Sequence, residues 1–188
     1  MKKFYGLFLV ILFFSFAYIT AGEQQFKLID FYSKVQSGEW VMMESSQGIE
    51  TLTLVVEKKD DTVTLDVKNS EHGQLLAVSR QYFSLKQNRF LEMHIQQDGQ
   101  SYIVQDPHNE IDQLMTLPLK KMGEDIVKTR KGRLKCMRYR GVYQDHVVDV
   151  WTHADIPILS VAKIATQMWK IKVQDWGNTG VKAFYVSE

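Results

Sequence analysis

The chain has 188 residues, 45% of them hydrophobic and 12% aromatic, with 23 basic and 22 acidic side chains and a formal net charge of +1. A balance this close to neutral argues against nucleic acid as the main partner, because nucleic-acid-binding domains carry a clear basic excess. Cys136 is the only cysteine, which excludes an intramolecular disulfide and leaves the core and the sheet hydrogen bonds to stabilise the fold.

The first 22 residues have the layout of a secretory signal peptide. Lys2 and Lys3 precede a run from residue 4 to residue 22 that carries no charge and is rich in Leu, Phe, Val and Ile. Small residues at Ala21 and Gly22 suit cleavage there, and no cysteine near the junction offers a lipid attachment site. We therefore predict an exported protein, either periplasmic or extracellular. The alternative is an uncleaved membrane anchor, because about 19 uncharged residues approach the length that spans a bilayer.

Residues 24–36 have the spacing of an amphipathic helix. Phe26, Ile29, Tyr32 and Val35 recur every three positions, and a Ser-Gly pair follows as a stop signal. We predict one helix over this range.

Beyond residue 38 the hydrophobic period changes to two, which is the spacing of β-strands, and short polar turns separate the strands. The strands are expected at 40–43, 49–58, 62–69, 74–85, 89–97, 101–105, near 125, and at 133–140, 146–152, 159–166, 169–176 and 181–186, with a loop at 106–122. We predict a mainly β fold: a curved antiparallel meander, forming a half-open barrel, whose apolar face the N-terminal helix covers. Residues 23–188 are expected to form a single domain.

The densest group of metal-ligand residue types is His146, Asp149, His153 and Asp155. In a strand His146 and Asp149 point to opposite faces, and Asp149 and His153 lie about 13 Å apart at about 3.3 Å per residue. A solvated strand face is therefore favoured over a metal site.

No motif for nucleophilic or phosphate chemistry occurs in the sequence. It has no Gly-x-Ser-x-Gly elbow, no glycine-rich phosphate loop and no His-Glu-x-x-His pair. The sequence thus favours a non-enzymatic protein without a cofactor or a bound metal. A catalytic site assembled from residues far apart in the chain stays open as an alternative.

Residues 120–140 hold nine basic side chains against only Glu124 and Asp125. Four of them define a candidate basic surface that could meet lipid head groups or an acidic partner: Arg133, Lys135, Arg138 and Arg140. The alternative is an exposed hairpin whose charges protect a sheet edge and keep the protein soluble.

Large aromatic residues recur along the predicted strands. A curved sheet lined by such residues can enclose an apolar ligand cavity, and the candidate lining residues are Trp40, Phe83, Phe90, Tyr102, Trp151 and Trp169. The same residues can also fill the interior as an ordinary packed core.

Two segments carry a family resemblance. The segments are 132–139, from Gly132 through Cys136, and 148–158, in which Trp151 precedes Ile156-Pro157. They resemble a signature of uncharacterised exported bacterial proteins, and Gly38-Glu39-Trp40-Val41 resembles the opening of such proteins. These proteins are similar in outline to the periplasmic lipoprotein-carrier (LolA-like) fold, a strongly curved antiparallel sheet around an apolar cavity. The resemblance implies structural roles for Cys136 and Trp151 and no catalytic one.

Together these features predict an exported, non-enzymatic protein that binds a lipid or another apolar or amphipathic ligand within a curved β-sheet. The main alternative is a cell-envelope scaffolding protein that engages another protein through the basic hairpin. A hydrolase with a dispersed site is the third.

Overall fold

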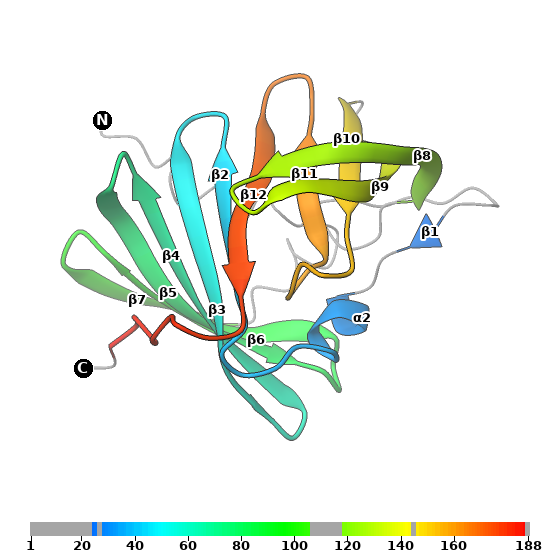
Figure 1. Cartoon of the computed structure of the whole chain (residues 1–188). Coiled ribbons are helices and arrows are strands. Elements are labelled where there is room, and N and C mark those ends of the chain that lie inside the picture. The colour runs from blue at the N-terminus through cyan, green and yellow to red at the C-terminus, as the bar shows by residue number, and fades with distance from the viewer. Residues whose placement is uncertain (1–23, 26–27, 106–117, 144–145, 187–188) are drawn as a thin grey trace.

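The computed structural model describes residues 24–25, 28–105, 118–143 and 146–186 (Figure 1). The predicted signal peptide and residues 106–117 of the predicted loop lie outside the described residues. The described part is mainly β. Its elements, in chain order, are β1 (Gln24–Gln25), α2 (Leu28–Tyr32), β2 (Trp40–Ser45), β3 (Ile49–Lys59), β4 (Thr62–Glu71), β5 (Gln74–Ser84), β6 (Arg89–Gln97), β7 (Gln100–Gln105), β8 (Pro118–Thr129), β9 (Gly132–Tyr143), β10 (His146–Thr152), β11 (Val161–Ala165) and β12 (Lys170–Gly177).

The strands form one antiparallel sheet in the order β1-β8-β9-β10-β11-β12-β2-β3-β4-β5-β6-β7. The sheet stays open, with β7 at one edge and β8, extended by the two-residue β1, at the other. Two-residue turns join many of the strands, as at Asp60-Asp61 and Asp98-Gly99. The predicted mainly β, antiparallel fold is therefore confirmed, and the sheet does not close into a barrel.

The predicted helix over residues 24–36 is wrong. Among the described residues of this range the helix comprises Leu28–Tyr32 alone, and Gln24 and Gln25 pair with β8 instead. A single turn fixes many dihedral angles for few hydrogen bonds, so tertiary packing must stabilise α2. Tyr32 and Val35 are both buried in the core. The three-residue spacing of the apolar residues therefore indicates which side chains are buried. It does not determine how long the helix is.

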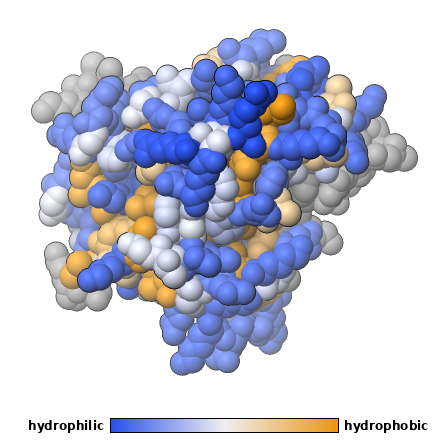
Figure 2. Space-filling model, viewed as in Figure 1, coloured by the Kyte–Doolittle hydropathy of each residue, from blue (hydrophilic) through white to orange (hydrophobic). Residues whose placement is uncertain are grey.

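Alternation along β2 to β5 divides these strands into an inner face and an outer face. The inner face carries Val41, Met43, Leu65 and Phe83, all members of the main hydrophobic core. Burial of each of these side chains stabilises the folded state by roughly 1.5–3 kcal/mol, so the hydrophobic effect is the main stabilising contribution of the inner face. The outer face carries the residues between them, such as Asp66. The side of the molecule in Figure 2 is mostly hydrophilic, with smaller apolar patches.

The hairpin β8–β9 reaches across the sheet to β12 (Figure 1). Its turn donates the Arg130 amide to the carbonyl of Gln174 at 2.9 Å, and the Arg130 guanidinium pairs with Glu50 at 3.2 Å. Gln174 lies at a register shift of β12, between Val173 and Asp175. A bulge leaves its extra residue outside the regular ladder, so that residue's carbonyl is free to accept the hairpin's amide.

Candidate functional site

A small cavity of about 50 Å³ lies between the inner face, α2 and the loop of residues 153–160. Its apolar wall comes from β2, β4 and the loop: Val41, Met43, Leu65, Val67, Ile158 and Leu159. Space of this size holds a few water molecules, whereas pockets for drug-sized ligands measure roughly 300–1,000 Å³. The cavity is thus a defined gap in the core, and a larger ligand requires that one wall move.

Polar side chains of β3, β4 and β5 lie beside this apolar wall. Thr51 donates its hydroxyl to Asn69 at 2.8 Å, and the Gln81 amide donates to the Ser79 hydroxyl at 3.3 Å. These four side chains are buried, and Thr51 and Gln81 line the cavity. Buried polar groups cost free energy unless they are hydrogen-bonded. The two hydrogen bonds remove this cost, so these polar side chains are stable beside the cavity.

The loop of residues 153–160 forms the cover of the cavity. Ile156 and Ile158 are 1% and 4% exposed, so the loop inserts both side chains into the core. The His153 amide closes the loop by donating to the Ser160 carbonyl at 2.9 Å. Ile158 has a φ of 71°, a left-handed conformation that a β-branched residue rarely adopts. Such a residue stores about 1–3 kcal/mol of strain, which the packing of the loop must offset.

The six aromatic residues predicted to line a ligand cavity are divided between different parts of the molecule. Phe83 and Phe90 pack in the core with their ring centroids 5.2 Å apart, and Tyr32 joins them with its centroid 4.6 Å from that of Phe83. Burial raises the pKa of the Tyr32 hydroxyl well above its ordinary value. Phe83 and Phe90 are therefore core residues, and Tyr32 is the aromatic residue that contacts the cavity.

The other four aromatic residues lie elsewhere. Trp151 is buried, Trp169 is half-buried against the core, and Tyr102 is exposed on the edge strand β7. Trp40 lies on the outer face, where its indole N–H donates to the Thr179 carbonyl at 2.9 Å. None of the four is among the residues that line the cavity.

Trp151 is the centre of a charged cluster. Its indole N–H donates to the Asp125 carboxylate at 2.8 Å, while the Lys163 ammonium and the Arg138 guanidinium lie 4.0 and 5.2 Å from its ring centroid. The hydrogen bond from Trp151, followed by that from the Ile126 amide, lowers the pKa of Asp125. Buried Cys136 stands opposite Asp125 in the β8–β9 register, and desolvation raises the pKa of its thiol. A thiol held protonated in this way is a poor nucleophile.

The predicted basic surface is split between two faces of β9. Arg133 and Lys135 alternate away from Arg138 and Arg140, because neighbouring positions of a strand point in opposite directions. Arg138 and Arg140 both bind Asp149, through ion pairs of 2.8 and 2.9 Å. Lys135 pairs with Glu124 at 2.7 Å.

The histidine and aspartate residues that lie close together in the sequence make separate contacts in the structure. Asp149 is held by the two arginines, and the His153 Nδ1 lies 3.9 Å from an Asp155 carboxylate oxygen. Across the described residues, no three His, Cys, Asp or Glu side chains gather closely enough to bind a metal ion.

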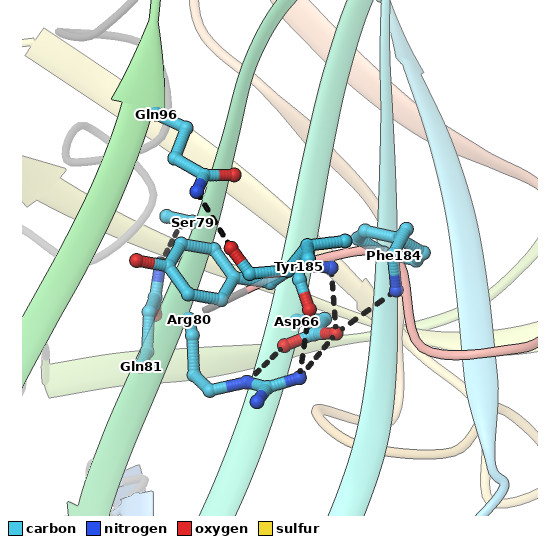
Figure 3. A network of polar contacts seen from close by, with 8 residues as sticks. Asp66, Ser79, Arg80, Gln81, Gln96, Phe184 and Tyr185 are labelled. Atoms are coloured by element: carbon cyan, nitrogen blue, oxygen red, sulfur yellow. Dashed lines mark hydrogen bonds and ion pairs between the residues drawn. The ribbon is translucent and has the colours of Figure 1, made fainter. Parts of the chain in front are cut away.

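A network on the outer face was not predicted. Asp66 is fully buried and accepts two bonds from Arg80 and one each from the amides of Phe184 and Tyr185 (Figure 3). The Gln96 amide donates to the Val186 carbonyl at 2.7 Å. Residues 178–186, the C-terminal segment, therefore cross the outer face from β2 to β6. The predicted strand at 181–186 is wrong, because this segment bonds to side chains and not to a neighbouring strand.

Sequence patterns offered little signal for these sites. Asp66 was one polar residue in a regular alternation, and Thr51 and Gln81 looked like ordinary polar strand residues. Their burial depends on the C-terminal segment and on the loop of residues 153–160, which come from distant parts of the chain.

The comparisons with known proteins inform the fold alone. No family model and no curated protein matches the chain. A solved structure, described as the hypothetical protein CT021 from Chlamydia trachomatis, superposes with a TM-score of 0.64 at 10% sequence identity. The match covers 87% of this chain and 98% of that one. The two proteins therefore share an overall fold. No helix within the described ranges is long and apolar enough to cross a membrane.

Proposed function

We propose that the protein is exported and binds an apolar or amphipathic ligand, such as a single acyl chain, on the inner face of its sheet. The observation that carries the proposal is the gap between the inner face and the loop of residues 153–160, with an apolar wall and a few polar side chains, Thr51, Thr53 and Gln81. A mostly apolar pocket with a few placed polar groups is the usual form of a small-molecule site.

Displacement of the loop provides the room that an acyl chain requires. When Ile156 and Ile158 leave the inner face, ligand methylenes replace their contacts, so little apolar area is lost. When the loop moves, Ile158 can leave its strained left-handed conformation, and this release offsets part of the free-energy cost of moving the loop. The loop has both ends in the sheet, at β10 and β11, so it can move as a hinged cover.

The resemblance to exported proteins of carrier-like outline supports the same function. The residues that carry it come together, since Cys136, Trp151 and Ile156 all belong to the main core cluster. We include export through residues 1–22 in this proposal, with the periplasm or the extracellular space as the destination and an uncleaved anchor as the alternative.

The alternative of a scaffolding surface on the basic hairpin has weaker support. Three of its four defining residues, Lys135, Arg138 and Arg140, already pair with acidic side chains. Charge reversal of these residues together with Arg133 should leave ligand binding unchanged under our proposal. It should abolish capture of an envelope partner under the alternative.

Native mass spectrometry of the full chain, purified from the compartment to which it is exported, tests the proposal directly. Organic extraction identifies any lipid that is retained, and titration with palmitate gives an affinity. Val67→Phe fills the cavity and should lower palmitate affinity at least tenfold, whereas Lys68→Phe, one position away on the outer face, should leave it unchanged. Absence of palmitate binding by the wild type, or equal binding by the two variants, would overturn the proposal.

A further inference from the structure

The edge strand β7 is exposed along its whole length. All six of its residues are exposed, among them Tyr102 at 48%, Ile103 at 60% and Val104 at 36%. The strand carries no charged residue and no proline. Within the described part of the chain β7 pairs only with β6, so one side of its main chain has no strand partner.

The opposite edge of the sheet is protected in the usual way. β8 carries Lys120, Lys121, Glu124, Asp125 and Lys128. Natural sheets place charges on an edge strand because an unpaired apolar edge is a template for another strand. The absence of such protection on β7 indicates that this edge has a partner.

The hairpin turn determines which main-chain groups of β7 point outward. Asp98 and Gly99 form a two-residue loop with φ values of 51° and 73°, so Gln97 and Gln100 close the hairpin as a hydrogen-bonded pair. Hydrogen-bonded and non-hydrogen-bonded pairs alternate along an antiparallel ladder. The amides and carbonyls of residues 101, 103 and 105 therefore point away from β6, toward the open edge.

We propose that β7 pairs antiparallel with β7 of a second copy of this chain, around a two-fold axis at Ile103. Side chains that stand opposite each other must lie on the same face of the sheet. Because the face alternates with every residue, the two paired residue numbers must both be odd or both be even. The register centred on Ile103 pairs residue 103 with itself and residue 101 with residue 105. It uses every outward-pointing group, about six main-chain hydrogen bonds, whereas a register centred on Tyr102 leaves residue 105 out.

The side chains of β7 suit this pairing. On one face Tyr102 stands opposite Val104 of the second copy, and this contact occurs twice because of the two-fold axis. Aromatic residues opposite β-branched ones are favourable cross-strand pairs. Tyr102 and Val104 also continue a buried apolar row, since they lie opposite Ile95 and Met93 of β6. A strand without charge meets no repulsion from its own copy. This chemistry identifies the second copy as the partner.

The proposal is tested on the full chain by sedimentation equilibrium and by disulfide cross-linking. The wild type should show a concentration-dependent monomer–dimer equilibrium, and Ile103→Lys, which places two ammonium groups together, should weaken the dimer at least tenfold. Ile103→Cys should cross-link under mild oxidation, because paired residues lie within about 5.5 Å.

Tyr102→Cys is the matched control for the cross-linking. In this register its two copies lie about 8 Å apart between Cα atoms, beyond the reach of a disulfide. Buried Cys136 gives the wild type no accessible thiol. A wild type that stays monomeric at every concentration, a dimer unaffected by Ile103→Lys, or cross-linking of Tyr102→Cys that equals or exceeds that of Ile103→Cys would each overturn the proposal.

Discussion

Arg80 holds the buried carboxylate of Asp66 in a two-pronged ion pair, with Nε to Oδ1 at 2.7 Å and Nη2 to Oδ2 at 3.0 Å. The pair lies where the C-terminal segment crosses the outer face, and Arg80 also covers the ring of Tyr185 at 5.2 Å. A buried charge is tolerated only when it is paired and its remaining acceptors are filled. The amides of Phe184 and Tyr185 fill those of Asp66, so the ion pair and the segment depend on each other.

Asp66→Asn should therefore lower the free energy of unfolding by about 3 kcal/mol, because Arg80 loses its counter-charge while it remains partly buried. Urea unfolding of the full chain measures the change. Asp61→Asn, in an exposed turn, should change the stability by less than about 0.5 kcal/mol. Equal stability of the two variants would contradict the interdependence of the ion pair and the segment.

Gly177→Ala should destabilise the protein by about 1–3 kcal/mol through overpacking. A Cβ at this position would lie 2.8 Å from Nε1 of Trp40, and the indole that it displaces holds the Thr179 carbonyl. In a Trp40→Ala background the same change should cost little, because the ring is absent. Thermal unfolding of the four proteins of this double-mutant cycle measures the coupling. Additive losses would show that the close approach is not the cause.

Trp151→Phe should raise the pKa of Asp125 toward the unfolded value of about 3.9, because the largest cause of its lowered pKa is the hydrogen bond from Trp151. A carboxyl with a lowered folded-state pKa contributes stability that is present above the unfolded pKa and is lost as pH falls through the folded one. The variant should therefore lose less stability between about pH 4 and pH 2 than the wild type. Carboxyl NMR titration reports the pKa, and Trp176→Phe should leave that of Asp125 unchanged.

Ile158→Gly should increase palmitate affinity severalfold while it lowers stability by about 1–3 kcal/mol. The change removes a side chain that lines the cavity, which enlarges the room for the acyl chain, and it deletes buried apolar contacts, which lowers the stability. Val63→Ala is the control, because Val63 is buried in the same core without lining the cavity or belonging to the loop. It should lose stability without the gain in affinity. Isothermal titration and urea unfolding measure the two quantities, and an equal gain in both variants would argue against the loop as a specific cover.

The main errors of the sequence analysis share one cause. Residues 24–36 and 181–186 have the spacing of a helix and a strand, yet the helix described in the first range spans Leu28–Tyr32 and the second range is irregular. Residues 28–36 and residues 181–186 pack against the sheet without adding a strand to it. Their backbone conformation follows from the partners they meet, which are the core around Tyr32 for the first segment and Asp66 for the second.

The sequence by itself determined the mainly β composition and the antiparallel connections, because a period of two and two-residue turns are local properties of the chain. It also determined that Cys136 has no disulfide partner. Only the tertiary structure decided that Thr51 and Gln81 border a gap, that Arg138 and Arg140 share Asp149, and that β7 stands at an open edge. These features depend on the order of the strands, on their register and on the segments that cover each face of the sheet. Contacts between residues far apart in the chain determine all of these.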